Sequence, residues 1–214
     1  MKKISKILIE SIRGLGAFAS ACGGITIGAD YDCLQPLVPG VKQRLILFNL
    51  DDLDVVAYSA VPPTSLIELI SLVSTKQGFA YEGIKRSLNP QYAFIPQTVS
   101  VGYDHQVDFL VFDVSQEQKD NLEAMGLGKV VAVVENNNSP GNANSVFEVY
   151  GLGVGLEIIT MTRIPGDLET TGAFAISLKT SDNEGKEPKM PQSWFDTDYA
   201  TTKAAVETLL VPAP

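Results

Sequence analysis

The chain has few of the residues that usually define an enzyme site. Its 214 residues include one histidine and two cysteines, Cys22 and Cys33. A single histidine excludes most sites built from several histidines. Two cysteines are too few for a disulfide scaffold, and we expect both to be reduced or inert. No run reaches the ~18 apolar residues of a membrane-crossing helix, so no membrane span is expected.

Motifs for common chemistries are also missing. There is no Gly-x-Ser-x-Gly elbow and no Gly-x-x-x-x-Gly-Lys-Ser/Thr loop. The segment 151–155, GLGVG, lacks the third glycine of a dinucleotide loop at the required spacing. It also precedes LEIITMT, which favours a strand over the helix that pyrophosphate needs. The sequence therefore predicts a protein that is not an enzyme, with no cofactor and no metal.

Three close carboxylates are the best cation candidates. Asp51, Asp52 and Asp54 separate the apolar runs LILFNL and VVAYSAV. Oxygen ligands suit Ca²⁺ or Mg²⁺, but the EF-hand spacing is absent. We expect a solvated turn here, with a metal-dependent enzyme as the alternative.

The balance of charge disfavours a grip on nucleic acid. The net charge is −9, and residues 101–150 alone carry eight acidic and two basic groups. Phosphate binding needs clustered Lys and Arg. Like charge along a pore would instead keep DNA from sticking as it passes.

The N-terminus resembles a secretory signal without meeting its requirements. MKKISKILIESIRGLGAFASAC has a basic start, an apolar middle and small residues before Cys22. Glu10 and Arg13 interrupt the apolar run, and a signal core normally lacks charge. A surface lipoprotein acylated at Cys22 remains an alternative hypothesis.

Two regions are expected. Residues 1–40 combine a short amphipathic helix near 3–13 with a Gly-rich extended arm, and residues 41–214 form a single β-rich domain. The second region is expected to carry helices near 65–76, 116–125 and 199–210. Thr64 would cap the first helix, and Ser115 with Gln118 fits a capping box for the second.

The stretch 98–114 gives the longest strand signal. Val99, Val101, Tyr103, His105, Val107, Phe109 and Val111 alternate with Ser100, Gly102, Asp104, Gln106 and Asp108. His105 lies among valines and aromatics, so we interpret it as a hydrogen-bonded structural residue. Antiparallel α+β architecture is favoured over a βαβ series.

Two further features have modest expected roles. Trp194, in MPQSWFDTD, is expected to cover the sheet beside the last helix, with an exposed binding anchor as the alternative. Lys85 and Arg86 form a compact basic spot. They are expected to be a solvated strand end, with an ion-pair contact to an acidic neighbour as the alternative.

From about Val146 onward the chain resembles bacteriophage tail tube proteins. The residues that carry the likeness are VFEVYGLGVGLEIITMTR, TTGAFAISLKTSDNEGKEPKMPQSWF and TTKAAVETLL. They share a pattern of a strand, a Gly turn, a strand, a polar loop, a strand, a charged loop and a terminal helix. This covers about a third of the chain and includes no catalytic residue.

The resemblance implies a β-sandwich or barrel with short flanking helices. Copies would close into rings, usually sixfold, that stack into a DNA-conducting tube in the phage virion, after assembly in the bacterial cytoplasm. Sister chains and other tail proteins would be its partners, and DNA would pass without specific binding. A head-to-tail adaptor, a tail terminator or a capsid decoration protein is the alternative within the same class.

Within that picture, particular residues are expected at particular surfaces. Asp104, Gln106 and Asp108 are the candidates for a lumen-facing strand. Gly23, Gly24, Asn137, Asn138 and Asn142 are the candidates for contacts between rings, because they lie in the Gly-rich arm and in the turn-rich NNNSPGNAN segment.

Overall fold

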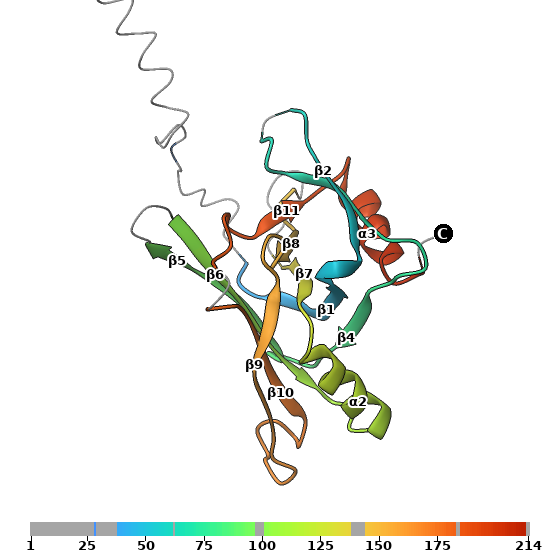
Figure 1. Ribbon diagram of the computed structural model, residues 1–214, viewed down its shortest axis with the longest axis vertical. Coiled ribbons are helices and arrows are strands. Elements are labelled where there is room, and N and C mark those ends of the chain that lie inside the picture. The colour runs from blue at the N-terminus through green and yellow to red at the C-terminus, as the bar shows by residue number, and fades with distance from the viewer. Residues whose placement is uncertain are drawn as a thin grey trace, which may run out of the picture. The chain divides into compact units, whose positions relative to one another are not determined.

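The computed structural model describes residues 28, 38–61, 63–96, 101–137, 144–182 and 185–212. The chain divides into a unit of residues 1–36 and a unit of residues 37–214. All the labelled helices and strands belong to the second unit (Figure 1). The expected N-terminal helix and Gly-rich arm lie almost entirely outside the described residues.

The second unit is α+β and mostly strand, as the sequence predicts. Its helices are α2 (Gln116–Met125) and α3 (Tyr199–Thr208), with a short 3-10 turn, η2 (Leu50–Asp52). Its strands are β1 (Val41–Asn49), β2 (Leu53–Tyr58), β3 (Ile67–Leu72), β4 (Phe79–Glu82), β5 (Leu88–Pro96), β6 (Val101–Val111), β7 (Val130–Asn136), β8 (Phe147–Tyr150), β9 (Leu156–Arg163), β10 (Phe174–Thr180) and β11 (Gln192–Trp194).

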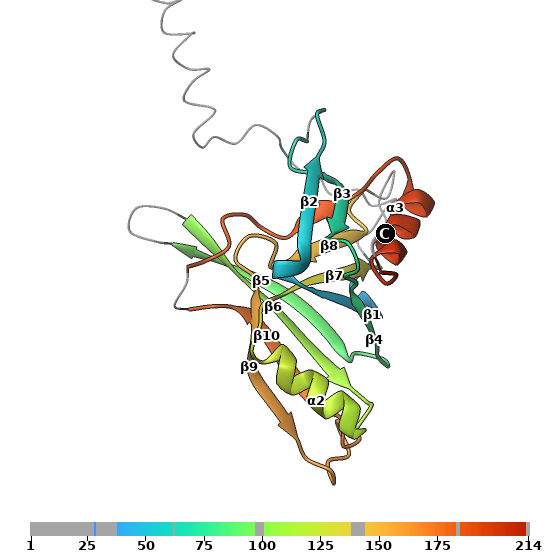
Figure 2. The same cartoon turned by 45° about the vertical axis from the view of Figure 1, so that its right-hand side comes forward.

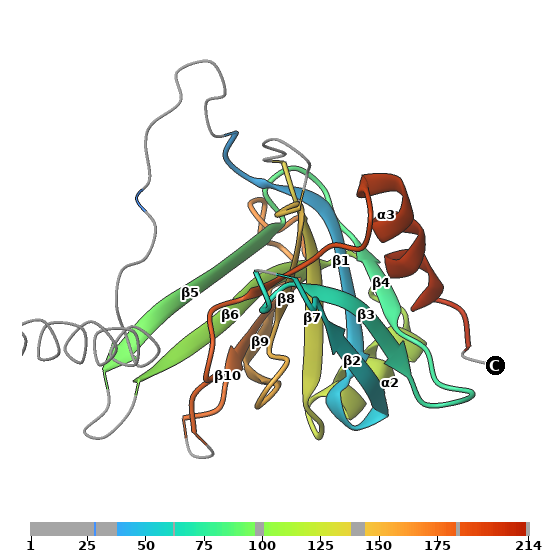
Figure 3. The ribbon, with the colours of Figure 1, turned by 90° about the horizontal axis from the view of Figure 1, so that it is seen from above.

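These strands form one branched sheet. The main order is β2-β3-β11-β8-β7-β9-β10-β6-β5, and β1 joins from the other side of β7 while pairing with β4. Seen from above, β5 lies at one margin of the sheet with β6 beside it (Figure 3). The sheet does not close within one chain, so neither a sandwich nor a barrel is established for the single copy.

The antiparallel β1–β7 pair lies at the centre of the unit. Its register sets Leu45 against Val134 and Leu47 against Ala132. Every side chain from 45 to 48 and from 130 to 134 is buried. Continuous apolar runs of this kind are buried on both faces. The pair therefore separates two hydrophobic cores.

The first core lies between β1–β7 and the strands β6, β9 and β10. Alternate residues of β6 and β10 point into it, including Val107, Phe109 and Leu178. Leu122 brings α2 against the same core. Figure 2 shows α2 in the lower half of the unit, and its Asn121 Nδ2 donates to the Tyr81 hydroxyl of β4 at 3.2 Å. Ser115 Oγ accepts the Gln118 N–H at 3.2 Å, so the predicted cap of α2 is confirmed.

The second core lies between the other face of β1–β7 and the β3, β11 and α3 elements. Trp194 is fully buried there with Val206 and Leu209 of α3, and its Nε1–H donates to the Glu68 carbonyl at 3.3 Å. The prediction that Trp194 covers the sheet beside the last helix is confirmed.

The helix predicted near 65–76 is wrong, because this segment is strand β3. Its residues pair antiparallel with β2, with Val56 opposite Ile70, and Trp194 of β11 pairs with Ile67. A short apolar run matches helical and strand periods almost equally well. Pairing on both sides decides the conformation here, and the sequence alone does not show those partners.

Removing a ring from the second core should destabilise the fold strongly. We expect Phe48→Ala, at a side chain 1% exposed, to lower the free energy of unfolding by about 3–5 kcal/mol. Phe94→Ala is the matched control, because Phe94 is 55% exposed and its loss should cost about 1 kcal/mol or less. Urea unfolding of both variants measures the difference. Equal losses would contradict the burial that distinguishes them.

Candidate functional site

Strands β9, β10, β6 and β5 make a four-stranded antiparallel sheet with two open edges. Strand β6 pairs with both β10 and β5. On the far side, β9 pairs with β7 only at Val130 and Leu156, so residues 157–163 pair with β10 alone. Strand β5 ends the strand order. Within the described residues, the outward backbone groups of both margins therefore have no strand partner.

The outer face of this sheet is polar. Asp104, Gln106 and Asp108 point to it together, because β6 alternates them with the buried residues of the first core. Gln106 Nε2 donates to Asp108 Oδ1 at 2.9 Å and to Ser177 Oγ at 3.2 Å. Gln91 Nε2 on β5 donates to the other oxygen of Asp108 at 3.3 Å. A hydrogen-bonded ladder thus crosses β5, β6 and β10.

Asp104 sits at the end of this ladder between two cations. Lys186 Nζ lies 2.6 Å and Lys179 Nζ 3.4 Å from its carboxylate. Burial lowers the pKa of Lys186, but hydrogen bonds to Asp104 and Asp182 outweigh it and raise that pKa overall. The hydrogen bond from Lys186, with both lysine charges, lowers the pKa of Asp182. The predicted acidic face is therefore partly neutralised at this end.

Exposed apolar side chains lie on the edge strands themselves. Tyr92 and Phe94 of β5, with Ile159 and Met161 of β9, are exposed. The Phe94 ring packs edge-on against Tyr103, with centroids 5.8 Å apart. Apolar side chains along an unpaired margin are typical of a surface that another chain covers.

His105 is a satisfied structural histidine, as predicted. Its side chain is 2% exposed. Nδ1 accepts the Gly151 N–H at 3.1 Å, and Nε2 lies 3.0 Å from the Lys189 carbonyl. A ring that accepts at Nδ1 must carry its proton at Nε2, so the imidazole is neutral and donates to Lys189. Burial lowers the pKa of His105 to about 4.

The GLGVG segment binds a carboxylate of its own chain. Glu187 is buried, and its Oε1 accepts the Val154 N–H at 2.8 Å and the Gly155 N–H at 3.3 Å. Its Oε2 accepts the Gly153 N–H at 3.0 Å. Successive N–H groups of this kind form an anion-binding nest. The rejection of a dinucleotide loop agrees with this geometry, because Glu187 occupies the donors that a phosphate would need.

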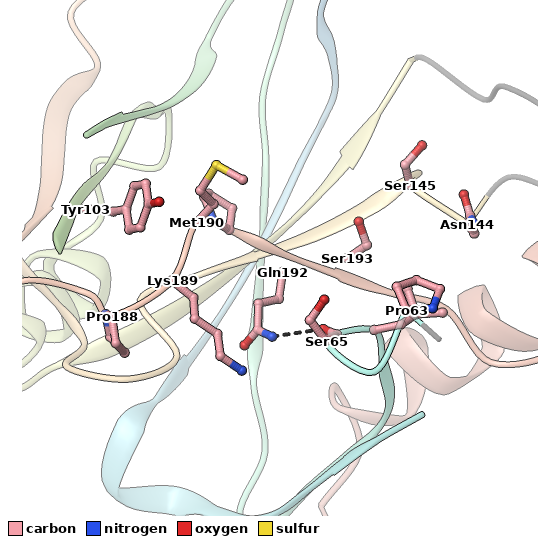
Figure 4. A pocket seen from close by; sticks show the side chains of 12 residues that line it. Pro63, Ser65, Tyr103, Asn144, Ser145, Pro188, Lys189, Met190, Gln192 and Ser193 are labelled. Carbon is pink, nitrogen blue, oxygen red and sulfur yellow. Dashed lines mark hydrogen bonds between the residues drawn. The ribbon is translucent and has the colours of Figure 1, made fainter. Parts of the chain in front are cut away.

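Residues 188–193 line one side of a hollow that also borders β3 and β8 (Figure 4). The hollow has a volume of about 420 Å³ and is lined by Tyr103, Ser145 and Met190 among others. Gln192 Nε2 donates to the Ser65 carbonyl at 2.8 Å across its wall. No histidine or carboxylate is among the described residues that line it. Lys189 is the one charged residue among the described residues that line it, and its Nζ lies 4.9 Å from the centroid of the Tyr58 ring.

The three carboxylates considered as cation ligands, Asp51, Asp52 and Asp54, differ in their surroundings. Asp52 accepts from Asn49 Nδ2 at 2.7 Å and lies 3.1 Å from Lys76 Nζ, so it is a paired, nearly buried group and not a solvated one. Asp51 and Asp54 are exposed. Within the described part of the chain, no group of three acidic, histidine or cysteine residues is placed to hold a metal.

Of the predicted ring-to-ring contacts, only Asn137 is described. Its backbone N–H donates to the Gly40 carbonyl at 2.9 Å. Gly23, Gly24, Asn138 and Asn142 lie outside the described residues, as do Cys22 and Cys33. The open edges of β5 and β9 were missed by sequence reasoning, since strand order is a tertiary property.

No protein family model, curated protein or solved structure matches this chain. None of the helices described is long and apolar enough to cross a membrane.

The neutral state of His105 should make stability pH-dependent. A pKa of about 4 in the folded state, against about 6.5 when unfolded, means that the unfolded chain binds the proton first. Stability from this group is complete above pH 6.5 and falls as the pH drops towards 4, by about 3 kcal/mol at most. Urea unfolding at pH 7 and pH 4 should show this loss in the wild type and a smaller one in His105→Gln. Equal losses in both chains would contradict the assignment.

Proposed function

We propose that this chain is a structural subunit of a bacteriophage tail tube. Copies would pair edge to edge into rings, and the rings would stack into a conduit for DNA. One observation carries the proposal: the four-stranded sheet β9-β10-β6-β5 has open strands at both margins. Strand β5 is nine residues long and has a strand partner on one side only. An open edge of this length is a liability that proteins normally cover or pair.

The even number of strands in the sheet permits closure by head-to-tail repetition. Its neighbours are all antiparallel, so the two edge strands of a four-stranded sheet run in opposite directions. When β9 of the next copy is laid beside β5, the pairing is again antiparallel. A heterologous contact that repeats by rotation closes into a ring, and a continuous barrel has no edge left.

The two faces of the sheet suit a tube wall. The face with Asp104, Gln106 and Asp108 is polar and hydrogen-bonded, which suits a water-filled lumen past which DNA slides. The opposite face holds the first core.

The expected ring size also gives a usable channel. Strands about 4.8 Å apart and tilted by about 40° each take roughly 6 Å of circumference. Six copies would give a barrel roughly 48 Å across between backbones, which leaves room for a DNA duplex after the side chains are counted. Three copies would give roughly half that width, too narrow for a duplex. Sixfold rings, implied by the resemblance, therefore agree with the strand geometry.

Other phage tail proteins would be partners at the ends of such a tube, and the virion would be its location. An adaptor, terminator or decoration protein would share the open edges if it also forms rings. Negative-stain electron microscopy of the purified full chain should show rings or stacked tubes. A chain that stays monomeric at high concentration would rule out the ring, and labelling in intact particles would separate tube from adaptor or terminator.

A charge on the open margin should block assembly without harming the fold. We expect Phe94→Lys to lose rings, because the side chain is 55% exposed in the single chain but would be buried between copies. Leu127→Lys is the control, since Leu127 is 93% exposed beyond the end of α2 and away from both edges. Sedimentation velocity measures assembly, and thermal unfolding checks the fold. Rings formed equally by both variants would argue against pairing at β5.

Positive charge on the polar face should slow DNA passage. We expect Gln91→Lys with Thr160→Lys to leave rings intact, because both residues are exposed, and to retain DNA at low salt by phosphate attraction. Ejection of DNA from particles built with this variant should be slower than with the wild type. Unchanged ejection, with rings present, would mean that this face points elsewhere.

A further inference from the structure

A basic hollow lies beside the start of the open β5 edge. Lys42 of β1 and the β4–β5 turn residues Lys85 and Arg86 line a cavity of about 680 Å³, with Val41 and Leu88 as apolar walls. Asn137, the one described residue among the expected ring-to-ring contacts, lines it too. The hollow therefore offers three cations around an apolar wall.

These three cations lack an acidic partner within the described residues, although the unit is rich in carboxylates. Residues 37–214 carry 12 Lys and Arg against 22 Asp and Glu. Most of the cations have a carboxylate or an aromatic ring as partner. Among the described residues, no ion pair is formed by Lys42, Lys85 or Arg86, although Arg44 nearby contacts both Glu82 and Glu207. Three unpaired cations in one hollow favour an anionic occupant.

The turn between β9 and β10 has the complementary chemistry. Leu168 at its tip is 92% exposed, and Glu169 beside it is exposed and has no ion pair within the described residues. Asp167 holds the turn, because its carboxylate accepts the N–H groups of Glu169 at 3.0 Å and Thr170 at 3.3 Å. The hydrogen bonds from Thr170 and Glu169 lower the pKa of Asp167. A preorganised turn thus presents one apolar and one acidic side chain.

The tip and the hollow lie at the same end of the sheet but on opposite margins. Arg163 pairs with Phe174, and Phe174 pairs with Val111. Leu110, next to Val111 in β6, donates its N–H to the Ser87 carbonyl at 3.0 Å. The end of β9 therefore lies at the same height along the sheet as the β4–β5 turn. Figures 1 and 2 show the β9–β10 tip beyond this end of the sheet.

Head-to-tail pairing of β9 with β5 would bring the tip of one copy to the hollow of the next. Strands tilted in a closed barrel are also staggered in register between neighbours.

We propose that the hollow receives the β9–β10 tip of a second copy of this chain. Leu168 packs against Val41 and Leu88, and Glu169 pairs with the cations of Lys42, Lys85 and Arg86. This inference rests on the proposed ring and names the contact that sets its register. Backbone pairing along an edge tolerates shifts of register. The contacts of Leu168 and Glu169 with the hollow would be possible in one register only.

Charge reversal tests the contact directly in the full-length chain. Glu169→Lys alone, or Lys85→Glu with Arg86→Glu, should weaken ring formation by about tenfold or more in subunit concentration. Combining all three changes should restore it. Glu123→Lys, an exposed position on α2 with the same change in charge, is the matched control. Sedimentation velocity at low and high salt measures each chain, and thermal unfolding checks that all are folded.

The outcomes separate the contact from the ring. Rescue in the combined variant supports the inference. If the wild type forms rings and Glu169→Lys forms them as well as the control Glu123→Lys does, the inference is overturned and the proposed function stands. Absence of rings in the wild type would overturn both.

Discussion

The fold depends on burying both faces of the β1–β7 pair. Because residues 45–48 and 130–134 have no polar side to present to water, each face requires its own cover. The first core is covered by β6, β10 and α2, and the second by β3, β11 and α3. Two covers around one central pair leave the peripheral strands supported on one face only.

The branching of the sheet follows from the segment between β8 and β9. Both strands pair with the same edge of β7, one after the other, so the chain must turn sharply between them. Gly151 and Gly155 take positive φ there, and Glu187 binds the freed N–H groups. This carboxylate holds segment 185–193 against His105. The same turn directs β9 away from β7, so that the outer edge of β9 stays open.

Features decided by local pattern could be predicted from the sequence. The alternation of β6 and the cap of α2 each depend on neighbouring residues. Strand β3 could not be predicted, because its partners are distant in sequence. The polar face was anticipated through Asp104, Gln106 and Asp108. Its neutralisation by Lys179 and Lys186 and the basic hollow at Lys42 depend on residues brought together only by tertiary pairing.

An open edge that serves assembly must also avoid indiscriminate pairing. Proline lacks a ladder donor and is confined to edge strands, and β5 carries Pro90 and Pro96 near its ends. The irregularity in β9 between the partners of Ser177 and Leu178 twists the other margin, as bulges do. Only the stretch between the two prolines is therefore free to form a regular ladder. A ladder that short is weak alone, so side-chain contacts such as a tip in a hollow are needed to select one partner and one register.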